Sequence, residues 1–133
     1  MTKILIVEDN EMNRDMLRRR LERKGYEILC AVDGPEGVRM AEEHLPDIVL
    51  MDVALGEMDG WEATTQIRGN ARTAHIPVIA LTAHALDSDR RKSVDVGCVD
   101  FETKPISLPD LIDKIERHTR SARSCTENIA YRP

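Results

Sequence analysis

Short, continuous apolar runs recur along the chain, and no other feature constrains its fold as strongly. The runs are Ile4 to Val7, Ile28 to Val32, Ile48 to Met51 and Val78 to Leu81, with a weaker one around Val99 to Phe101. Such short runs, apolar at every position, are typical of parallel strands buried on both faces. The segments between them carry apolar residues at helical spacing, most clearly after the last run, at Leu108, Leu111, Ile112 and Ile115. The chain therefore alternates strand and helix.

This alternation predicts an α/β fold with a doubly wound sheet of five parallel strands. Parallel strands joined by helices require right-handed crossovers, which place helices on both faces of the sheet. Glycine and proline separate the elements, as at Gly25 and Pro46, where helical patterns stop. If the first and third strands are neighbours, the strand order is 2-1-3-4-5, which is the flavodoxin-like order.

Composition narrows the class of protein further. The 133 residues, 41% of them hydrophobic, suffice for one domain with a buried core. The net charge of −5 disfavours binding to nucleic acid or to anionic lipid. The first apolar run is too short for a signal peptide or a membrane span, and the three cysteines lack the spacing of a disulfide framework or zinc site. We therefore expect a cytoplasmic protein with no direct contact to nucleic acid or membrane.

The helical pattern ends near Arg120, which divides the chain into two parts. Residues 1–120 are predicted to form the folded domain, and residues 121–133 are predicted to be a polar, disordered C-terminal tail. We expect no output domain after this tail.

Acidic residues follow two predicted strands that should be neighbours. Glu8 and Asp9 follow the first strand, and Asp52 ends the third. Because ligand sites in doubly wound sheets lie at the carboxyl ends of the strands, we expect these side chains to meet in one shallow pocket. Three crowded carboxylates repel one another unless a cation is supplied. Mg²⁺ suits such a site, since it prefers oxygen ligands and usually sits between carboxylates and a phosphate.

Two further strand ends supply groups suited to a phosphoryl group. Thr82 ends the fourth strand and Lys104 follows the fifth. An ammonium attracts a phosphoryl oxygen as a point charge, and a hydroxyl can donate to another oxygen. A carboxylate can act as the nucleophile and form an aspartyl phosphate. Asp52, at the end of the most apolar strand, is the best candidate for that role.

The residues singled out above resemble the receiver domains of two-component response regulators, and among them the stand-alone receivers. The resemblance covers residues 3 to about 120 and rests on motifs in a specific order and spacing. They are Ile-Leu-Ile-Val-Glu-Asp-Asn at 4–10, Leu-Met-Asp at 50–52, Met-Asp-Gly at 58–60, Leu-Thr-Ala at 81–83 and Lys-Pro-Ile at 104–106. The resemblance implies Asp52 as the phosphoacceptor. It implies Mg²⁺ as the cofactor, with ligands from Glu8, Asp9, Asp52 and the backbone carbonyl of Ala54.

The resemblance also implies how the site works. The phosphoryl group comes from a phosphohistidine on a sensor histidine kinase or a histidine phosphotransfer domain, and Thr82 and Lys104 contact it. Such a receiver is a phosphoacceptor that catalyses its own phosphorylation and dephosphorylation, and Ala54 and His84 tune the lifetime of the product. Thr82 then couples to Phe101 and reshapes the face of the fourth helix, fifth strand and fifth helix. This face binds a downstream protein and is a candidate homodimer interface.

Some positions bear on how closely the chain follows the family pattern. Phe101 stands where many members have tyrosine, and Gly56 stands where many have proline, so the loop after the acceptor is expected to be softer. The Lys104-Pro105 peptide bond is commonly cis in the family.

Alternative interpretations stay open. Phe101 is equally well explained as a core residue, and the basic residues of the first helix fit a solvated face better than a docking surface. Met58-Asp59-Gly60 is predicted to be a turn and helix cap. The same fold serves flavodoxin-like cofactor carriers and small phosphatases, although Glu8 and Asp9 would repel a flavin phosphate. The chain could also be a receiver fragment of a larger regulator or of a hybrid kinase.

Overall fold

The computed structural model describes residues 2–55, 58–83 and 87–131, and their side chains except at 87–89 and 120–131. Gly56 and His84, which the sequence analysis singled out, lie outside the described residues.

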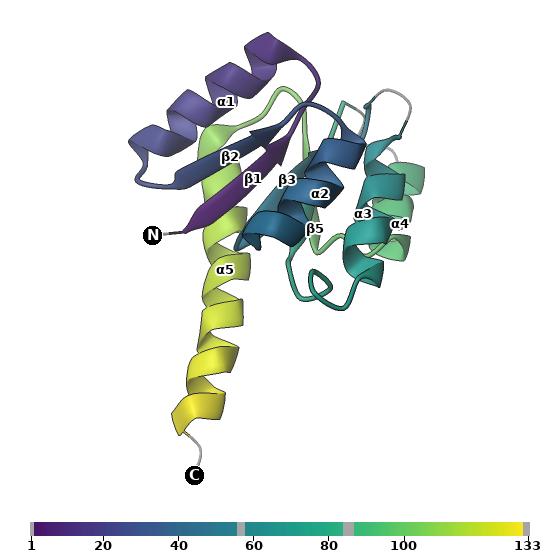
Figure 1. The fold of residues 1–133 in the computed structure, drawn as a ribbon. Helices are drawn as coiled ribbons and strands as arrows, with labels where there is room; N and C mark the ends of the chain where they lie inside the picture. Colours follow the sequence, from purple (N-terminus) through teal and green to yellow (C-terminus); the bar gives the residue numbers. More distant parts are fainter. Residues whose placement is uncertain (1, 56–57, 84–86, 132–133) are drawn as a thin grey trace.

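A parallel sheet of five strands forms the centre of the molecule (Figure 1). The strands are β1 (Lys3–Val7), β2 (Glu27–Ala31), β3 (Ile48–Asp52), β4 (Val78–Thr82) and β5 (Asp100–Thr103). Their order is β2-β1-β3-β4-β5, and every neighbouring pair is parallel. The predicted fold class and strand order are therefore confirmed.

The helices cover both faces of this sheet. They are α1 (Glu11–Arg23), α2 (Gly34–His44), α3 (Gly60–Gly69), α4 (Asp87–Asp95) and α5 (Leu108–Tyr131). Helices α1 and α5 lie on one face, α2 and α3 lie on the other, and α4 lies beside α3 (Figure 1). Successive strand residues point to opposite faces, so Ile4 and Ile6 pack with α1 and α5 while Leu5 and Val7 pack with α2 and α3.

Side-chain caps explain where three of the helices begin. Asn10 accepts the backbone N–H of Asn13 at 2.9 Å at the start of α1. Asp59 accepts the backbone N–H of Glu62 at 2.8 Å at the start of α3, which confirms the predicted turn and cap at residues 58–60. Asp33 caps α2 in the same way. These caps satisfy N–H groups that have no partner within the helix, and they fix the position of each strand-to-helix loop.

Helix α5 is longer than the sequence pattern predicted. It runs through Tyr131 and extends well beyond the sheet (Figure 1). The backbone helix thus continues past residue 120. Apolar periodicity stops near residue 120 because it reports burial against the sheet rather than helix formation itself. The division into a folded domain at residues 1–120 and a tail at 121–133 stays a prediction.

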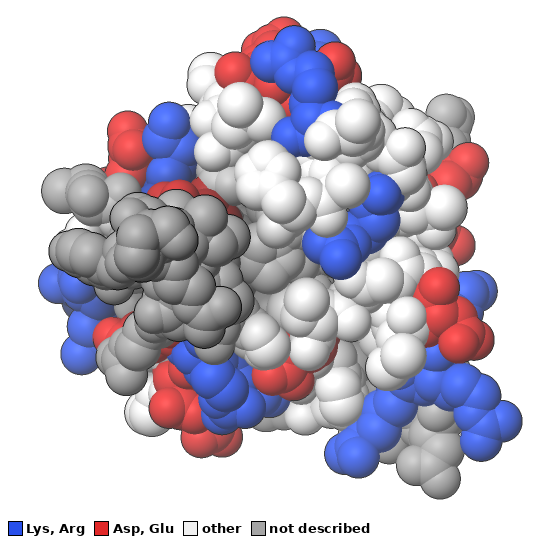
Figure 2. Space-filling model, turned by 90° about the horizontal axis from the view of Figure 1, so that it is seen from below, with Lys and Arg blue, Asp and Glu red and all other residues white. Residues whose placement is uncertain are grey.

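The end of the molecule at which the strands begin carries mainly uncharged residues. In the view from below, acidic and basic side chains lie mostly around the margin of this end (Figure 2). Over the part of the chain that the structure describes, no helix combines the length and the apolar character that crossing a membrane requires. The acidic residues predicted to form a site lie at the opposite end of the sheet.

The burial of Cys98 in the core predicts that its thiol reacts slowly. This side chain is buried beside Thr64, and burial raises the pKa of its thiol to about 11. Because the thiolate is the reactive form, iodoacetamide at pH 8 should label Cys98 at least about 100-fold more slowly in the folded protein than in urea. Peptide mass spectrometry of the Cys98 peptide measures both rates. Equal rates in buffer and in urea would contradict this account of the core.

Candidate functional site

Three carboxylates meet at the carboxyl ends of β1 and β3. Glu8 and Asp9 directly follow β1, and Asp52 is the last residue of β3. One carboxylate oxygen from each of the three lies within 4.8 Å of the others. Glu8 is 3% exposed and Asp52 2% exposed, whereas Asp9 is exposed. The structure therefore brings together the acidic residues that the sequence predicted to converge.

The carboxylate of Asp52 is oriented by the loop that follows it. Its Oδ1 accepts the backbone N–H of Ala54 at 3.0 Å. The N-terminus of α3 packs directly against the same segment, since the backbone N–H of Gly60 donates to the Val53 oxygen at 3.2 Å. A Cβ atom at Gly60 would lie only 2.3 Å from the backbone oxygen of Asp52. Only glycine allows this approach, so Gly60 is part of the frame that holds Asp52 in place.

Lys104 contributes a cation to the cluster. Its Nζ lies 3.2 Å from Asp52 Oδ2 and 3.4 Å from Glu8 Oε2. Its backbone N–H donates to the Thr82 oxygen at 2.7 Å, which ties the end of β5 to the end of β4. The Lys104-Pro105 peptide bond is cis, as the resemblance implied. Burial disfavours the charged ammonium, but attraction from Asp52 and Glu8 outweighs burial and raises the pKa of Lys104.

The charges in this cluster do not balance. One ammonium faces three carboxylates, two of which are buried. The pKa of Glu8 is raised from 4.5 to about 7, mainly by burial and then by the hydrogen bond and repulsion from Asp52, and Lys104 offsets only part of this. Buried carboxylates in excess of their cations fit a divalent ion with a preference for oxygen. The donor set therefore fits Mg²⁺.

The same excess of charge predicts a pH-dependent stability without metal. Because the pKa of Glu8 is higher in the folded protein than its ordinary value of 4.5, the folded state binds the proton more tightly than the unfolded state. The free energy of unfolding should therefore fall as the pH rises from 5 to 8, by roughly 1 to 3 kcal/mol from this group. The variant Glu8→Gln should lack that part of the slope. Urea unfolding in EDTA at both pH values measures it, and parallel pH slopes for the two proteins would contradict the prediction.

Thr82 and Phe101 lie where the sequence placed them, at or near strand ends. Thr82 is the last residue of β4 and is buried. Phe101 lies in β5, is half-buried and packs against the core cluster on the α2 and α3 face. The core interpretation of Phe101 is thus supported by its packing, and its role as a switch stays a prediction.

Two contacts near the site were not anticipated from the sequence. One is the approach of Gly60 to Asp52, which depends on how α3 packs on β3. The other is made by Arg14, whose Nη1 donates to the backbone oxygen of Glu8 at 2.9 Å. The neighbouring residue Arg18 pairs instead with Asp15 and Glu22 within α1, as expected for a solvated helix face. Nothing in the spacing of the arginines distinguishes Arg14 from the others.

A groove opens beside the carboxylate cluster. It has a volume of about 580 Å³ and runs between α1 and the loop that joins β5 to α5. Glu8 and Lys104 line one part of it, and Met16, Ile106 and Leu108 supply apolar walls. A partner that reaches Asp52 from this side would meet apolar surface next to charge.

Comparisons with known proteins agree with this site. The family model of the response regulator receiver domain matches residues 4–116. The polar-differentiation response regulator DivK of Brucella ovis is 41% identical over 123 residues, which are 92% of this chain and 100% of that protein. The Brucella anthropi protein of the same name is 40% identical over 119 residues, 90% of this chain and 97% of its own.

Solved structures show the same fold. The receiver domain of a sensor histidine kinase from Pseudomonas aeruginosa, with a magnesium ion coordinated in its active-site cleft, is 36% identical. It has a TM-score of 0.83 and covers 89% of this chain and 97% of its own. The chemotaxis protein CheY4 of Vibrio cholerae is 27% identical with a TM-score of 0.84, covering 88% of this chain and 98% of its own. A function in two-component signalling follows from these matches, and the length of DivK fits a stand-alone receiver. The chain belongs to the response regulator receiver domain family.

Proposed function

We propose that this receiver accepts a phosphoryl group from a phosphohistidine onto Asp52, with Mg²⁺ as the cofactor. The observation that carries the proposal is the buried carboxylate of Asp52 with Lys104 at 3.2 Å and two further carboxylates beside it. Lys104 neutralises only part of this charge, so a divalent cation and a phosphoryl group complement the site.

The proposed ligands of Mg²⁺ are the carboxylates of Glu8, Asp9 and Asp52 and the backbone carbonyl of Ala54. The three carboxylates already lie close enough together to share one ion. The Pseudomonas aeruginosa receiver with magnesium in its cleft supports the choice of metal. When bound, Mg²⁺ supplies positive charge that neutralises the phosphoryl oxygens during transfer.

The residues of the chain supply the remaining chemistry. A carboxylate oxygen of Asp52 attacks phosphorus and forms a P–O bond, while the P–N bond of the donor phosphohistidine breaks and its electron pair leaves with the imidazole. Lys104 Nζ attracts a phosphoryl oxygen, and the Thr82 hydroxyl donates to another. Because these groups all belong to the receiver, the receiver catalyses its own phosphorylation. Water later attacks the same phosphorus, the P–O bond to Asp52 breaks, and inorganic phosphate leaves with the Asp52 carboxylate restored. Ala54 and His84 tune the rate of that loss.

The proposed partners are proteins. The donor is a sensor histidine kinase or a histidine phosphotransfer domain, in the cytoplasm. The proposed target is a downstream protein that binds the surface formed by α4, β5 and α5, here called the α4-β5-α5 surface. A homodimer through this surface is part of the same proposal. The net charge of −5 argues against direct binding to nucleic acid or anionic membrane.

The tryptophan fluorescence of the chain tests the proposed site. Trp61 is the only tryptophan, and it follows Gly60, which packs against Asp52. Beryllofluoride, a phosphoryl analogue, should change the Trp61 emission in the presence of Mg²⁺. The variant Asp52→Ala should abolish the change. A wild-type protein that ignores beryllofluoride and Mg²⁺, or a variant that responds as strongly, would contradict the proposal.

A further inference from the structure

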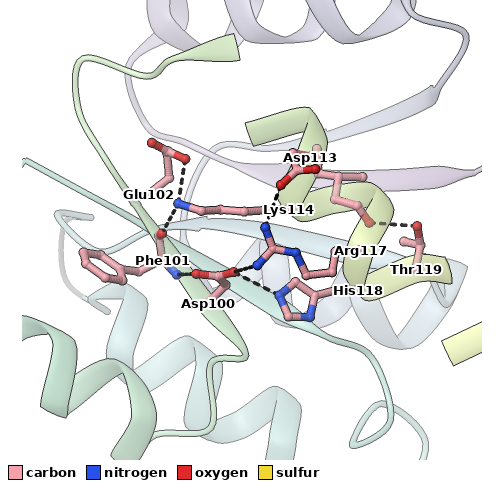
Figure 3. A network of polar contacts seen from close by, with 9 residues as sticks. Asp100, Phe101, Glu102, Asp113, Lys114, Arg117, His118 and Thr119 are labelled. Atoms are coloured by element: carbon pink, nitrogen blue, oxygen red, sulfur yellow. Dashed lines mark hydrogen bonds and ion pairs between the residues drawn. The ribbon is translucent and has the colours of Figure 1, made fainter. Parts of the chain in front are cut away.

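Helix α5 holds the edge of the sheet through side chains centred on Phe101 (Figure 3). Lys114 Nζ donates to the backbone oxygen of Phe101 at 2.8 Å and to Glu102 Oε2 at 2.9 Å. Asp100 Oδ1 accepts the backbone N–H of Phe101 at 2.9 Å, and Asp100 Oδ2 lies 3.0 Å from His118 Nε2. An edge strand leaves backbone groups without a strand partner, and here side chains bond both groups of Phe101.

The aromatic ring of Phe101 lies near two cations from different helices. The guanidinium carbon of Arg90, in α4, lies 4.8 Å from the ring centroid. Lys114 Nζ, in α5, lies 6.0 Å from the same centroid. Cations within about 6 Å of a ring face are attracted by the ring quadrupole. Phe101 has no hydroxyl group, and its ring interacts with these two cations through its face.

The strand that carries Phe101 leads directly to the site. Lys104 follows Phe101 by three residues and pairs with Asp52 at 3.2 Å and with Glu8 at 3.4 Å. A phosphoryl group on Asp52 would attract the same ammonium to its own oxygens. Phe101 therefore lies between Arg90 and Lys114 in the same conformation that pairs Lys104 with Asp52.

We propose that Arg90 and Lys114 are positioning residues that hold the Phe101 ring and stabilise the α4-β5-α5 surface in its unmodified conformation. The inference rests on the proposed function of Asp52, and it names the side chains that regulate how the α4-β5-α5 surface responds to phosphorylation of Asp52. A phosphoryl group shifts the population only by as much as it favours the other conformation. The contacts of Arg90 and Lys114 with the ring stabilise the unmodified conformation and therefore oppose this shift. Removing either cation should strengthen the response to phosphorylation.

The test uses the fact that Phe101 is the only phenylalanine in the chain. Phenylalanine labelled with carbon-13 in the ring gives NMR signals that come from Phe101 alone. The full chain, wild type and with Arg90→Met, Lys114→Arg or both Lys114→Met and Glu102→Gln, is titrated with beryllofluoride at fixed Mg²⁺. The Glu102→Gln change accompanies Lys114→Met because Glu102, 8% exposed, would otherwise keep a buried charge without its cation.

The expected result has two parts. Arg90→Met and the Lys114→Met, Glu102→Gln protein should each shift the Phe101 signal before any analogue is added. Each should also bind beryllofluoride about two- to five-fold more tightly, as the loss of one cation–π contact allows. Lys114→Arg keeps the cation and should behave like wild type.

Lys92→Met is the matched control. Lys92 lies in the same helix as Arg90 but contacts a different ring, with its Nζ 5.8 Å from the Trp61 centroid. This variant should leave the Phe101 signal and the beryllofluoride affinity unchanged.

Two outcomes separate this inference from the proposed function. If wild type responds to beryllofluoride but the affinity stays the same or falls in Arg90→Met and in the Lys114→Met, Glu102→Gln protein, the positioning role is wrong and the phosphoacceptor site stands. An unmoved Phe101 signal in those variants overturns the positioning role as well. If neither Trp61 nor Phe101 of the wild type responds to beryllofluoride with Mg²⁺, the proposed function fails, and the inference fails with it.

Discussion

Asp52→Asn is expected to lower phosphate incorporation from acetyl phosphate by at least about 100-fold, because the amide lacks the nucleophilic carboxylate oxygen. The substitution keeps the size of the side chain and removes one charge from a cluster with an excess of carboxylates. The folded state should therefore survive, and the loss should be chemical. Radiolabelled or mass-shifted protein after incubation with acetyl phosphate and Mg²⁺ measures the effect.

Asp95→Asn is the control for this loss. Asp95 ends α4, is exposed and lies outside the carboxylate cluster. Its replacement removes the same charge and should leave phosphate incorporation within about two-fold of wild type. If Asp52→Asn retained the wild-type rate, or if both variants lost it equally, Asp52 would not be the acceptor.

Gly60→Ala is expected to destabilise the fold by about 3 kcal/mol or more. The added Cβ would meet the backbone of the Asp52 segment, 2.3 Å from the Asp52 oxygen and 2.6 Å from Val53 Cα. Backbone atoms of a buried strand cannot move aside as a flexible side chain can. The start of α3 must instead move away from β3, which also loosens the frame around Asp52.

Gly69→Ala is a matched control, because both glycines belong to helix α3. A Cβ at Gly69 would meet nothing within 4 Å. Alanine favours the helix, so this variant should be unchanged or more stable by up to about 1 kcal/mol. Urea unfolding of the two variants gives the comparison. Equal stabilities would show that helix propensity, not contact with Asp52, determines the effect at Gly60.

Much of the fold follows from local sequence patterns. Apolar runs such as Ile48–Met51 are short and continuous because a central parallel strand is buried on both faces, and all five residues of β3 are buried. The helical extension after residue 120 could not be inferred in the same way. Sequence periodicity reports which face of a helix packs on a core, and a helix segment that extends beyond the sheet has no such face to reveal.

The candidate site was predictable for a topological reason. Carboxyl ends of neighbouring parallel strands share one edge of the sheet, so residues following β1 and ending β3 must lie close together whatever joins them. Contacts that depend on packing distance escaped prediction. Gly60 reaches Asp52 only because α3 docks closely on β3, and Lys114 reaches the backbone oxygen of Phe101 only because of how α5 packs on the sheet.

The central claim is that Asp52 accepts a phosphoryl group because a hard cation neutralises the carboxylates around it. Mass spectrometry of peptides after incubation with acetyl phosphate, with Mg²⁺ and in parallel with EDTA, tests this claim most directly. We predict phosphate on the peptide that contains Asp52 in Mg²⁺ and almost none in EDTA. Folded protein that carries no phosphate at Asp52 in Mg²⁺ with an active donor, or equal amounts in Mg²⁺ and EDTA, would contradict the account.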